Sequence, residues 1–306
     1  MSLRNAFAET ITKISRVDER LVVFVGDISH GIFKDLRQEF PERYYNIGIC
    51  EPAMVNVAAG LSAKGLIPVV HTIAPFLIER SYEQIKLDFA YQGLGVNLIS
   101  VGGAFDYAKL GCSHHCYTDY SLMSKFSKSN IFFPGSEVEF SSIFENVYDN
   151  GEINYFRLTE FPHNVPIESA EIKIGEAIKV SSGSDLTIIT AGAALKRVKE
   201  ATGLLNASGY TVDILYYHTL KPFDVKKVLD SVSKTRKVVV FEENSSEDGL
   251  FKLVNNAISG KFVYDIEQLA INDFVRTYGT YEYLCEISGL STSTLLDVSL
   301  KLIECH

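Results

Sequence analysis

The stretch that decides the fold is YYNIGICEPAM, residues 44–54. Its first half is a short apolar run, typical of a buried strand, and the run ends just before Pro52. Proline suits the first turn of a helix, because its missing N–H would have no partner there. Apolar residues then recur at helical spacing as far as Leu61, and Gly65 follows the expected end of the helix. Glu51 is therefore predicted at a turn from strand to helix.

Two roles are open for Glu51. Its carboxyl has apolar neighbours on both sides, and such a group can hold a proton near neutral pH unless it is paired with a cation. The simpler role is that of a helix cap, because the helix dipole favours an acidic side chain near the N-terminus. On this stretch alone the cap is the better explanation, so the rest of the sequence has to decide.

The bulk composition is that of a soluble globular protein. The 306 residues allow two domains, and 46% hydrophobic with 22% charged residues is ordinary. The net charge of −9 argues against general binding to nucleic acid or to an anionic membrane. No apolar run is long enough to span a bilayer, and the N-terminus lacks a signal-peptide pattern. An odd number of scattered cysteines, 5 in all, suits reduced thiols. We therefore expect a cytoplasmic protein.

Apolar runs alternate with helix-length segments in the first half of the chain. The predicted elements are strands over 21–25, 67–71, 96–101, 131–133 and 155–157 and a helix over 76–91. Continuous apolar strands separated by helices indicate a parallel sheet covered on both faces. Functional loops then lie at the carboxyl ends of the strands, where Asp27, Glu51 and Gly102 fall.

This rhythm is lost between residues 161 and 184, where prolines and a Ser-Gly run are typical of a linker. A second series follows, with strands predicted over 186–190, 211–216 and 237–241 and helices over 193–206 and after Pro222. The predicted fold class is therefore α/β, with two doubly wound domains. The first domain covers residues 1–165, the linker covers 166–184, and the second domain covers 185–306.

The densest polar cluster is GCSHHCY, residues 111–117. Two cysteines and two histidines invite a zinc interpretation, but adjacent histidines project in different directions and no second ligand pair lies at a usual distance. We expect no metal site here. A loop that presents one histidine to a ligand fits better, since imidazole can donate, accept or move a proton near neutral pH. For His115, a hydrogen bond to a loop carbonyl is the simpler role.

Aromatic residues recur along the helix predicted in the first domain. Tyr82 and Phe89 are expected in the core, whereas Phe76, nearest the preceding strand, is the candidate for a ring-stacking surface. The sequence has no Gly-x-Gly-x-x-Gly and no Walker loop. The pair Gly26-Asp27 lacks the second glycine and the distant asparagine of a magnesium-diphosphate motif. The chain therefore shows no phosphate cradle of its own.

The order of these motifs resembles that of the transketolase family. The matching segments are residues 45–54 with AAGL at 58–61 (family pattern N-x-G-I-x-E-x-x-M…A-A-G-L), FLIERSYEQ at 76–84 (F-x-x-x-R-A-Y-D-Q-I), GCSH at 111–114 (D-G-x-T-H), TLKPFD at 219–224 (T-L-K-P-L-D) and VVFEE at 239–243 (V-V-V-x-E-E). The first three patterns belong to the pyrimidine-binding domain and the last two to the C-terminal domain. Five motifs in the same order cover nearly the whole chain.

The resemblance implies a thiamine diphosphate enzyme. In the family, the glutamate matching Glu51 is catalytic: it bonds to N1′ of the cofactor pyrimidine and promotes the imino form that removes the thiazolium C2 proton. The aromatic residue matching Phe76 packs against the pyrimidine ring, and Ile73 is expected at the cofactor too, where transketolases usually have an aromatic. The histidine matching His114 contacts the sugar substrate, and His30 is a second candidate for substrate binding.

Only the C-terminal section of a transketolase is matched. The domain that binds diphosphate and Mg²⁺, with its Gly-Asp-Gly motif, has no counterpart, so a separate chain is expected to carry it. Active sites of the family lie between domains of different protomers, which implies a heterotetramer with an N-terminal-section subunit. We therefore expect the C-terminal-section subunit of a split transketolase, a transferase that moves a two-carbon ketol unit between sugars and is active only with its partner.

Two substrate positions depart from the family. Leu110 replaces the aspartate that reads a substrate hydroxyl, and Glu160 stands where relatives commonly have the arginine that holds the sugar phosphate. A carboxylate repels a phosphate dianion at close range, so an unphosphorylated or nucleotide-linked sugar is expected.

Two alternatives remain open. One is a beta subunit of a 2-oxoacid dehydrogenase or of an enzyme like deoxyxylulose-phosphate synthase. The other is a non-catalytic regulatory subunit that keeps the fold, against which an intact Glu51 argues.

Overall fold

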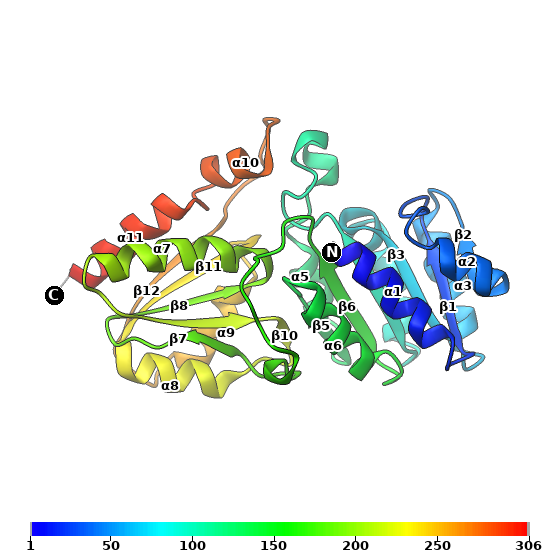
Figure 1. The fold of residues 1–306 in the computed structure, drawn as a ribbon, viewed down its shortest axis with the longest axis horizontal. Helices are drawn as coiled ribbons and strands as arrows, with labels where there is room; N and C mark the ends of the chain where they lie inside the picture. The colour runs from blue at the N-terminus through cyan, green and yellow to red at the C-terminus, as the bar shows by residue number, and fades with distance from the viewer. Residues whose placement is uncertain (1, 305–306) are drawn as a thin grey trace.

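The computed structural model describes residues 2–304, and within that range no helix is both long enough and apolar enough to cross a membrane. The chain forms two α/β lobes that lie side by side, each built on its own sheet with helices packed against it (Figure 1). The first lobe contains a seven-stranded sheet and the second a five-stranded one. The predicted α/β class with two sheets is confirmed.

The first lobe is a mostly parallel sheet with the strand order β10-β5-β6-β4-β3-β1-β2. Its elements before the second lobe are α1 (Leu3–Ser15), β1 (Leu21–Val25), α2 (Lys34–Glu39), β2 (Tyr44–Asn46), α3 (Glu51–Ser62), β3 (Ile67–Ile73), α4 (Tyr82–Gln84), β4 (Val96–Val101), α5 (Asp119–Ser124), β5 (Ser129–Phe132), α6 (Glu137–Val147) and β6 (Ile153–Leu158). Val25 pairs with His71, and Ile73 pairs with Val101. The carboxyl ends of β1, β3 and β4 therefore share one edge of the sheet.

The second lobe has the strand order β12-β11-β8-β9-β7. The elements of this half of the chain are β7 (Ile178–Ser181), β8 (Leu186–Ala191), α7 (Leu195–Ala207), β9 (Val212–Tyr217), β10 (Thr219–Lys221), α8 (Val225–Thr235), β11 (Lys237–Ser245), α9 (Leu250–Ile258), β12 (Asp265–Ile271), α10 (Tyr281–Ile287) and α11 (Thr292–Glu304). Every strand pair in this sheet is parallel except β7 with β9.

The predicted boundary between the domains is crossed twice. β7 lies inside the predicted linker 166–184, yet it pairs with β9 and completes the second sheet. β10 lies inside the predicted second domain 185–306, yet it pairs antiparallel with β5 and closes one edge of the first sheet. Both strands are too short for a periodicity signal, which is why neither was predicted.

Two predicted elements of the first lobe differ in detail. β2 is an edge strand that pairs only with β1, and Tyr45 and Asn46 are exposed, so the prediction of a buried strand is wrong. The helix predicted over 76–91 is a broken helix, with π-helical turns over Pro75–Glu79 and Ile85–Ala90 on either side of α4. Such π-helical turns are frequent at functional sites.

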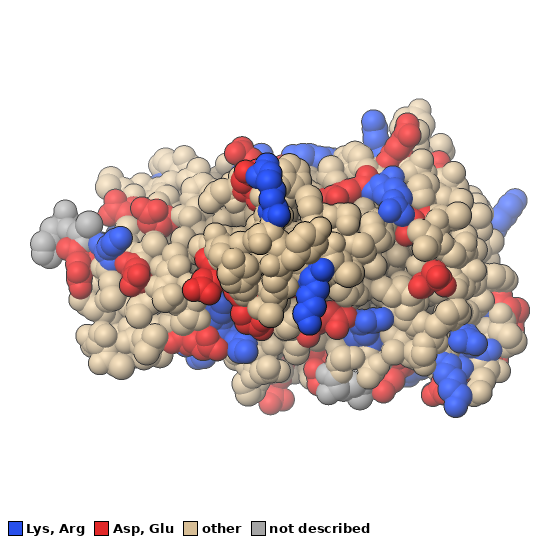
Figure 2. All heavy atoms as spheres, turned by 90° about the horizontal axis from the view of Figure 1, so that it is seen from above, with Lys and Arg blue, Asp and Glu red and all other residues tan. Residues whose placement is uncertain are grey.

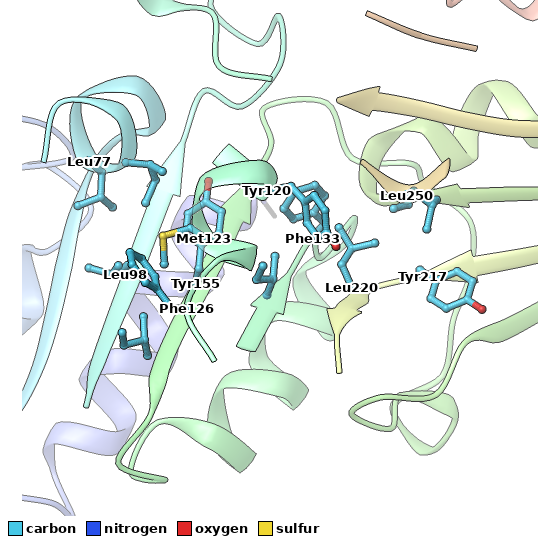
Figure 3. Close-up of a cluster of buried hydrophobic side chains, with 14 of the residues drawn as sticks. Leu77, Leu98, Tyr120, Met123, Phe126, Phe133, Tyr155, Tyr217, Leu220 and Leu250 are labelled. Atoms are coloured by element: carbon cyan, nitrogen blue, oxygen red, sulfur yellow. The ribbon is translucent and has the colours of Figure 1, made fainter. Parts of the chain in front are cut away.

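The largest buried cluster runs through both lobes. Figure 3 shows it passing from Leu77 and Leu98 in the first lobe, through Phe133 and Leu220, to Leu250 in the second. Leu220 is a residue of β10 and is fully buried. One continuous apolar core therefore joins the two sheets.

A buried polar network also joins the lobes. Glu139 of α6 accepts hydrogen bonds from the Tyr216 hydroxyl (2.6 Å) and the Gly135 N–H (2.7 Å), and His163 Nε2 lies 2.7 Å from it. Burial alone would raise the pKa of Glu139, but the hydrogen bonds from His163 and Tyr216 outweigh burial and lower that pKa. The Glu139 carboxylate is thus charged and fully buried, and its hydrogen bond with Tyr216 links α6 to β9.

The surface carries mixed charge. On the face seen in Figure 2, acidic and basic side chains are interspersed over both lobes. This pattern agrees with the modest net charge of −9.

Candidate active site

The predicted site residues gather at the carboxyl edge of the first sheet. Glu51 opens α3 immediately after the β2 turn, and a Cβ added to Gly26 at the end of β1 would stand 2.9 Å from Thr72 Oγ1 and 3.6 Å from Glu51 Cγ. The absence of a side chain at Gly26 therefore leaves room for Thr72 of β3, and the Glu51 side chain lies within contact distance of the same point. This is the edge at which ligands bind in open α/β sheets.

The Glu51 carboxylate is buried, with 1% of the residue exposed, and its Oε2 accepts a hydrogen bond of 2.7 Å from Arg80 Nη1. The sequence left two roles open for Glu51, a helix cap and a carboxyl at a binding site. The observed contact is with the Arg80 side chain and not with the first turn of α3, as a helix cap would require. The Arg80 side chain is 42% exposed. The ion pair therefore joins an enclosed carboxylate to a guanidinium that is partly open to solvent.

Phe76 lies beside this pair. The guanidinium carbon of Arg80 is 4.2 Å from the centre of the Phe76 ring, and the His114 ring meets the same phenyl ring edge-on, with centroids 5.1 Å apart and planes at 74°. His114 Nδ1 is 3.0 Å from the Ser113 hydroxyl. Burial and the nearby charge of Arg80 lower the pKa of His114. The structure thus brings Glu51, Phe76 and His114 together.

Ile73 joins the group from the end of β3. A Cβ on Gly102 would lie 3.3 Å from Ile73 Cγ2 and 2.4 Å from the Tyr107 ring. The side chains of Ile73 and Tyr107 therefore both approach the Gly102 backbone closely. The Tyr107 ring in turn lies 6.4 Å from the His114 ring. Tyr107 was not predicted. It supplies an aromatic ring next to the aliphatic Ile73, and its position in an irregular loop left no pattern by which to find it.

His30 lies further out on the same edge. Its Nε2 accepts a 2.8 Å hydrogen bond from the Asn46 amide, and its Nδ1 is 3.2 Å from the Tyr44 hydroxyl. Asn46 Oδ1 also accepts from the backbone N–H groups of Asp27 and Gly48. His30 is exposed and is held by the turn that precedes α3, whereas His114 belongs to the group around Phe76.

The other residues of the polar loop 111–117 play different parts. His115 is buried and packs edge-on against Phe105 at 5.2 Å. Cys112 is exposed and Cys116 is buried; Cys305 lies outside the described residues. Within residues 2–304, no group of three or more histidine, cysteine, aspartate or glutamate side chains is arranged to hold a metal ion.

Comparison with known proteins identifies both parts of the chain. Residues 1–160 match the model of the transketolase pyrimidine-binding domain, and residues 175–293 match that of the transketolase C-terminal domain. The chain belongs to the transketolase family.

Among transketolases, the chain is similar to subunits of about its own length. It is 27% identical to the 6-deoxy-6-sulfo-D-fructose transketolase subunit SqwH of Clostridium sp. (strain MSTE9), over 99% of this chain and 94% of that protein. It is 26% identical to one of the subunits of the apulose-4-phosphate transketolase of Phocaeicola vulgatus, over 99% and 98%. A solved structure described as a split gene transketolase, inactive beta4 tetramer, superposes with a TM-score of 0.89 at 26% identity, over 99% and 98%. The predicted resemblance to the C-terminal section of a split transketolase is confirmed.

The two departures from the transketolase pattern lie on the outer part of this edge. Leu110 is half exposed. Glu160 forms an ion pair with Arg4 of α1, with Nη1 and Oε1 3.0 Å apart, and its backbone N–H donates to the Asp106 carboxyl. Asp106 is buried, and burial raises its pKa to about 8. Glu160 is thus a carboxylate whose negative charge is paired with the guanidinium of Arg4.

Arg4 also reaches inward to β3. Its Nη2 donates to the Ser29 hydroxyl (2.8 Å), and that oxygen lies 2.8 Å from His71 Nε2. His71 Nδ1 lies 2.8 Å from the carbonyl of Ile99, so Nδ1 carries the proton and Nε2 accepts from Ser29. Burial lowers the pKa of His71 to about 4 and keeps it neutral. The sequence placed His71 at a strand end but contained no signal that joined it to residue 4.

Proposed function

We propose that this chain is the subunit of a split, thiamine diphosphate-dependent transketolase that holds the pyrimidine end of the cofactor. One observation carries the proposal: a buried carboxylate, Glu51, stands beside the Phe76 ring at the carboxyl edge of the first sheet. A carboxylate that faces a ring nitrogen and an aromatic face that packs on the ring are what an aminopyrimidine requires. The side chains present therefore fit the group.

Each residue then has a defined task. When bound, thiamine diphosphate supplies the carbanion chemistry by which a two-carbon ketol unit is cut from one sugar and joined to another. Glu51 holds and shares a proton at the pyrimidine N1′, a role that depends on its enclosed position. Phe76 packs against the ring, and Ile73 contributes an apolar side chain from the end of β3. His114, oriented by Ser113, and His30, oriented by Asn46, offer hydrogen bonds to substrate hydroxyl groups.

The rest of the enzyme would come from another chain. The described residues contain no cluster suited to Mg²⁺, so we propose that the metal and the diphosphate are held by an N-terminal-section subunit. The likeness to a beta4 tetramer supports assembly of this chain with itself, and a heterotetramer with the partner would complete the site. The cytoplasm, where sugars and the reduced cysteines would coexist, is the proposed location.

We also propose that the substrate is not a sugar phosphate held in the usual way. The Arg4 guanidinium is already paired with Glu160, so this position offers a neutral pair rather than a free cation. A phosphate dianion would have to compete with Glu160 for Arg4. An unphosphorylated or nucleotide-linked sugar would not.

The proposal is tested by reconstitution with a separate chain that carries a Gly-Asp-Gly motif, to be sought among the products of neighbouring genes. We expect ketol transfer only from the mixture, and we expect Glu51→Gln to lower turnover on the order of 100-fold or more while the fold is retained. Glu42→Gln, an exposed change on the nearby surface, is the matched control. Full activity of the Glu51→Gln mixture would mean that Glu51 has no catalytic role.

A further inference from the structure

Arg80 contacts both of the groups that the proposed function assigns to the cofactor ring. It donates to Glu51 Oε2 at 2.7 Å, and its guanidinium carbon lies 4.2 Å from the centre of the Phe76 ring. These are the carboxylate and the aromatic surface that an aminopyrimidine would use. A guanidinium is also flat and presents N–H donors along its edge, as a protonated aminopyrimidine does.

We propose that Arg80 is a built-in stand-in for the pyrimidine ring, which keeps the site ordered until loading and has to swing out before the cofactor can bind. This inference rests on the proposed function of the site. It assigns to Arg80 the part of a positioning and gating residue, since Arg80 itself acts on Glu51 and not on substrate.

The surroundings of Arg80 allow this movement. Its side chain is 42% exposed, and the residue ends the first π-helical turn, so the guanidinium can leave towards solvent without unpacking the core. Glu51, by contrast, is 1% exposed and is the first residue of α3. The carboxylate therefore stays in place, and only the cation has to be exchanged.

The exchange would also change the hydrogen-bond donor that the Glu51 carboxylate faces. Glu51 Oε2 accepts a charge-assisted hydrogen bond from Arg80, and in the exchange the ring nitrogen would take the place of that donor. The proposed task of Glu51 at the ring nitrogen begins only when Arg80 no longer neutralises it. Displacement costs the binding step a charge-assisted hydrogen bond and a cation–π contact. A partner that anchors the diphosphate would offset that loss, so loading would depend on assembly.

The test uses the pyrimidine half of the cofactor alone, 4-amino-5-hydroxymethyl-2-methylpyrimidine, which is neutral and has no diphosphate. Its binding to the full chain is followed by NMR, together with the guanidinium signal of Arg80, which is assigned from an Arg80→Met variant. We expect Arg80→Met to bind the probe about tenfold more tightly or better, and we expect the probe to shift the Arg80 signal in the wild-type chain towards that of a free arginine. Lys86→Met, an exposed change in the same broken helix, is the matched control and should bind as the wild type does.

Three results overturn the inference, and they separate it from the proposed function. If Arg80→Met binds the probe no better than the wild type while Glu51→Gln and Phe76→Ala weaken binding, the cofactor site stands and the stand-in role of Arg80 is wrong. If the probe binds without moving the Arg80 signal, Arg80 lies beside the ring rather than in its place. If no variant binds the probe and the reconstituted complex binds no thiamine diphosphate with Mg²⁺, both proposals fall.

Discussion

At the scale of single residues, ion pairing decides what each carboxylate can do. Glu51 and Glu160 lie on the same edge of the first sheet, and each is paired with an arginine. Glu51 is 1% exposed, so its carboxylate meets Arg80 shielded from solvent. Glu160 is about one-third exposed, and solvent screens its pair with Arg4. The two ion pairs therefore differ in how strongly solvent weakens them.

Substrate preference follows from the second pair. In the reconstituted enzyme, Glu160→Arg is expected to raise kcat/KM for xylulose 5-phosphate by at least about tenfold, because it replaces a repelling carboxylate with a second cation beside Arg4. The unphosphorylated analogue should change little. Glu160→Gln is the intermediate control, which removes the repulsion without adding a cation. A wild-type enzyme that strongly prefers the phosphate, with no gain from Glu160→Arg, contradicts the assignment.

The buried imidazole of His71 predicts a pH effect on stability. Its folded pKa of about 4 lies below the unfolded value of 6.5, so the unfolded chain takes up the proton first as the pH falls. The contribution of His71 is complete above pH 6.5 and is lost towards pH 4, which amounts to about 3 kcal/mol at roughly 1.4 kcal/mol per pH unit.

The measurement is the free energy of unfolding in urea at several pH values, for the wild type and for His71→Asn. We expect the difference between the two proteins to shrink as the pH falls from about 7 to about 4.5, the range over which the unfolded chain alone is protonated. Equal acid sensitivity of both proteins is the outcome that excludes His71 as the titrating group.

At the scale of elements, the site depends on where strands end and helices begin. The strand-to-helix turn at Glu51 could be predicted because Pro52 and the apolar period after it are local signals. The end of β3 and the loop after β4 were located for the same reason. Arg4, Ser29 and Tyr107 could not be predicted, because their contacts join α1, the loop after β1 and an irregular loop that are distant in sequence.

The same reason explains the errors in the fold. β7 and β10 carry too few residues to show a period, and each is stabilised by a partner strand far along the chain. Predictions from local pattern were accurate for long buried strands such as β4, whose bounds are those expected. They failed for the short strands at the sheet edges, which a partner strand distant in sequence selects.

Helix α6 offers a test of how elements are joined. Glu139→Gln is expected to lower the free energy of unfolding by about 2–4 kcal/mol, because a buried carboxylate that accepts from Tyr216, Gly135 and His163 loses its charge. Glu145→Gln on the same helix breaks only the exposed pair with Lys13 and should cost less than about 1 kcal/mol. Urea unfolding of both variants, with Tyr216→Phe in a double-mutant cycle, measures the coupling between α6 and β9. If the losses of unfolding free energy from Glu139→Gln and Tyr216→Phe simply add, the two side chains are not energetically coupled, which would contradict a junction between α6 and β9.

At the scale of the whole molecule, the two lobes share a core and a strand. The cluster that contains Phe133 and Leu220 is continuous from one sheet to the other. Each lobe would expose apolar surface on its own, so neither is an independent folding unit.

Calorimetry of the chain is therefore expected to show a single unfolding transition. Leu220→Ala should shift that transition as a whole, with a loss of about 2–5 kcal/mol from the cavity in β10. Leu204→Ala, at a half-exposed position of α7, is the control and should have a small effect. Two resolved transitions, only one of which responds to Leu220→Ala, would contradict a shared core.

The crossing of β10 from the second lobe into the first sheet has a consequence for how such a gene can be rearranged. A recombination break between the codons for β6 and β10 would separate the first sheet from its edge strand β10. The fragment that carries the second lobe would then hold β10 without its partner strand β5. Shuffling that exchanges one lobe while keeping the other is thus penalised at every junction in that interval. The two lobes are therefore expected to be inherited as a single module.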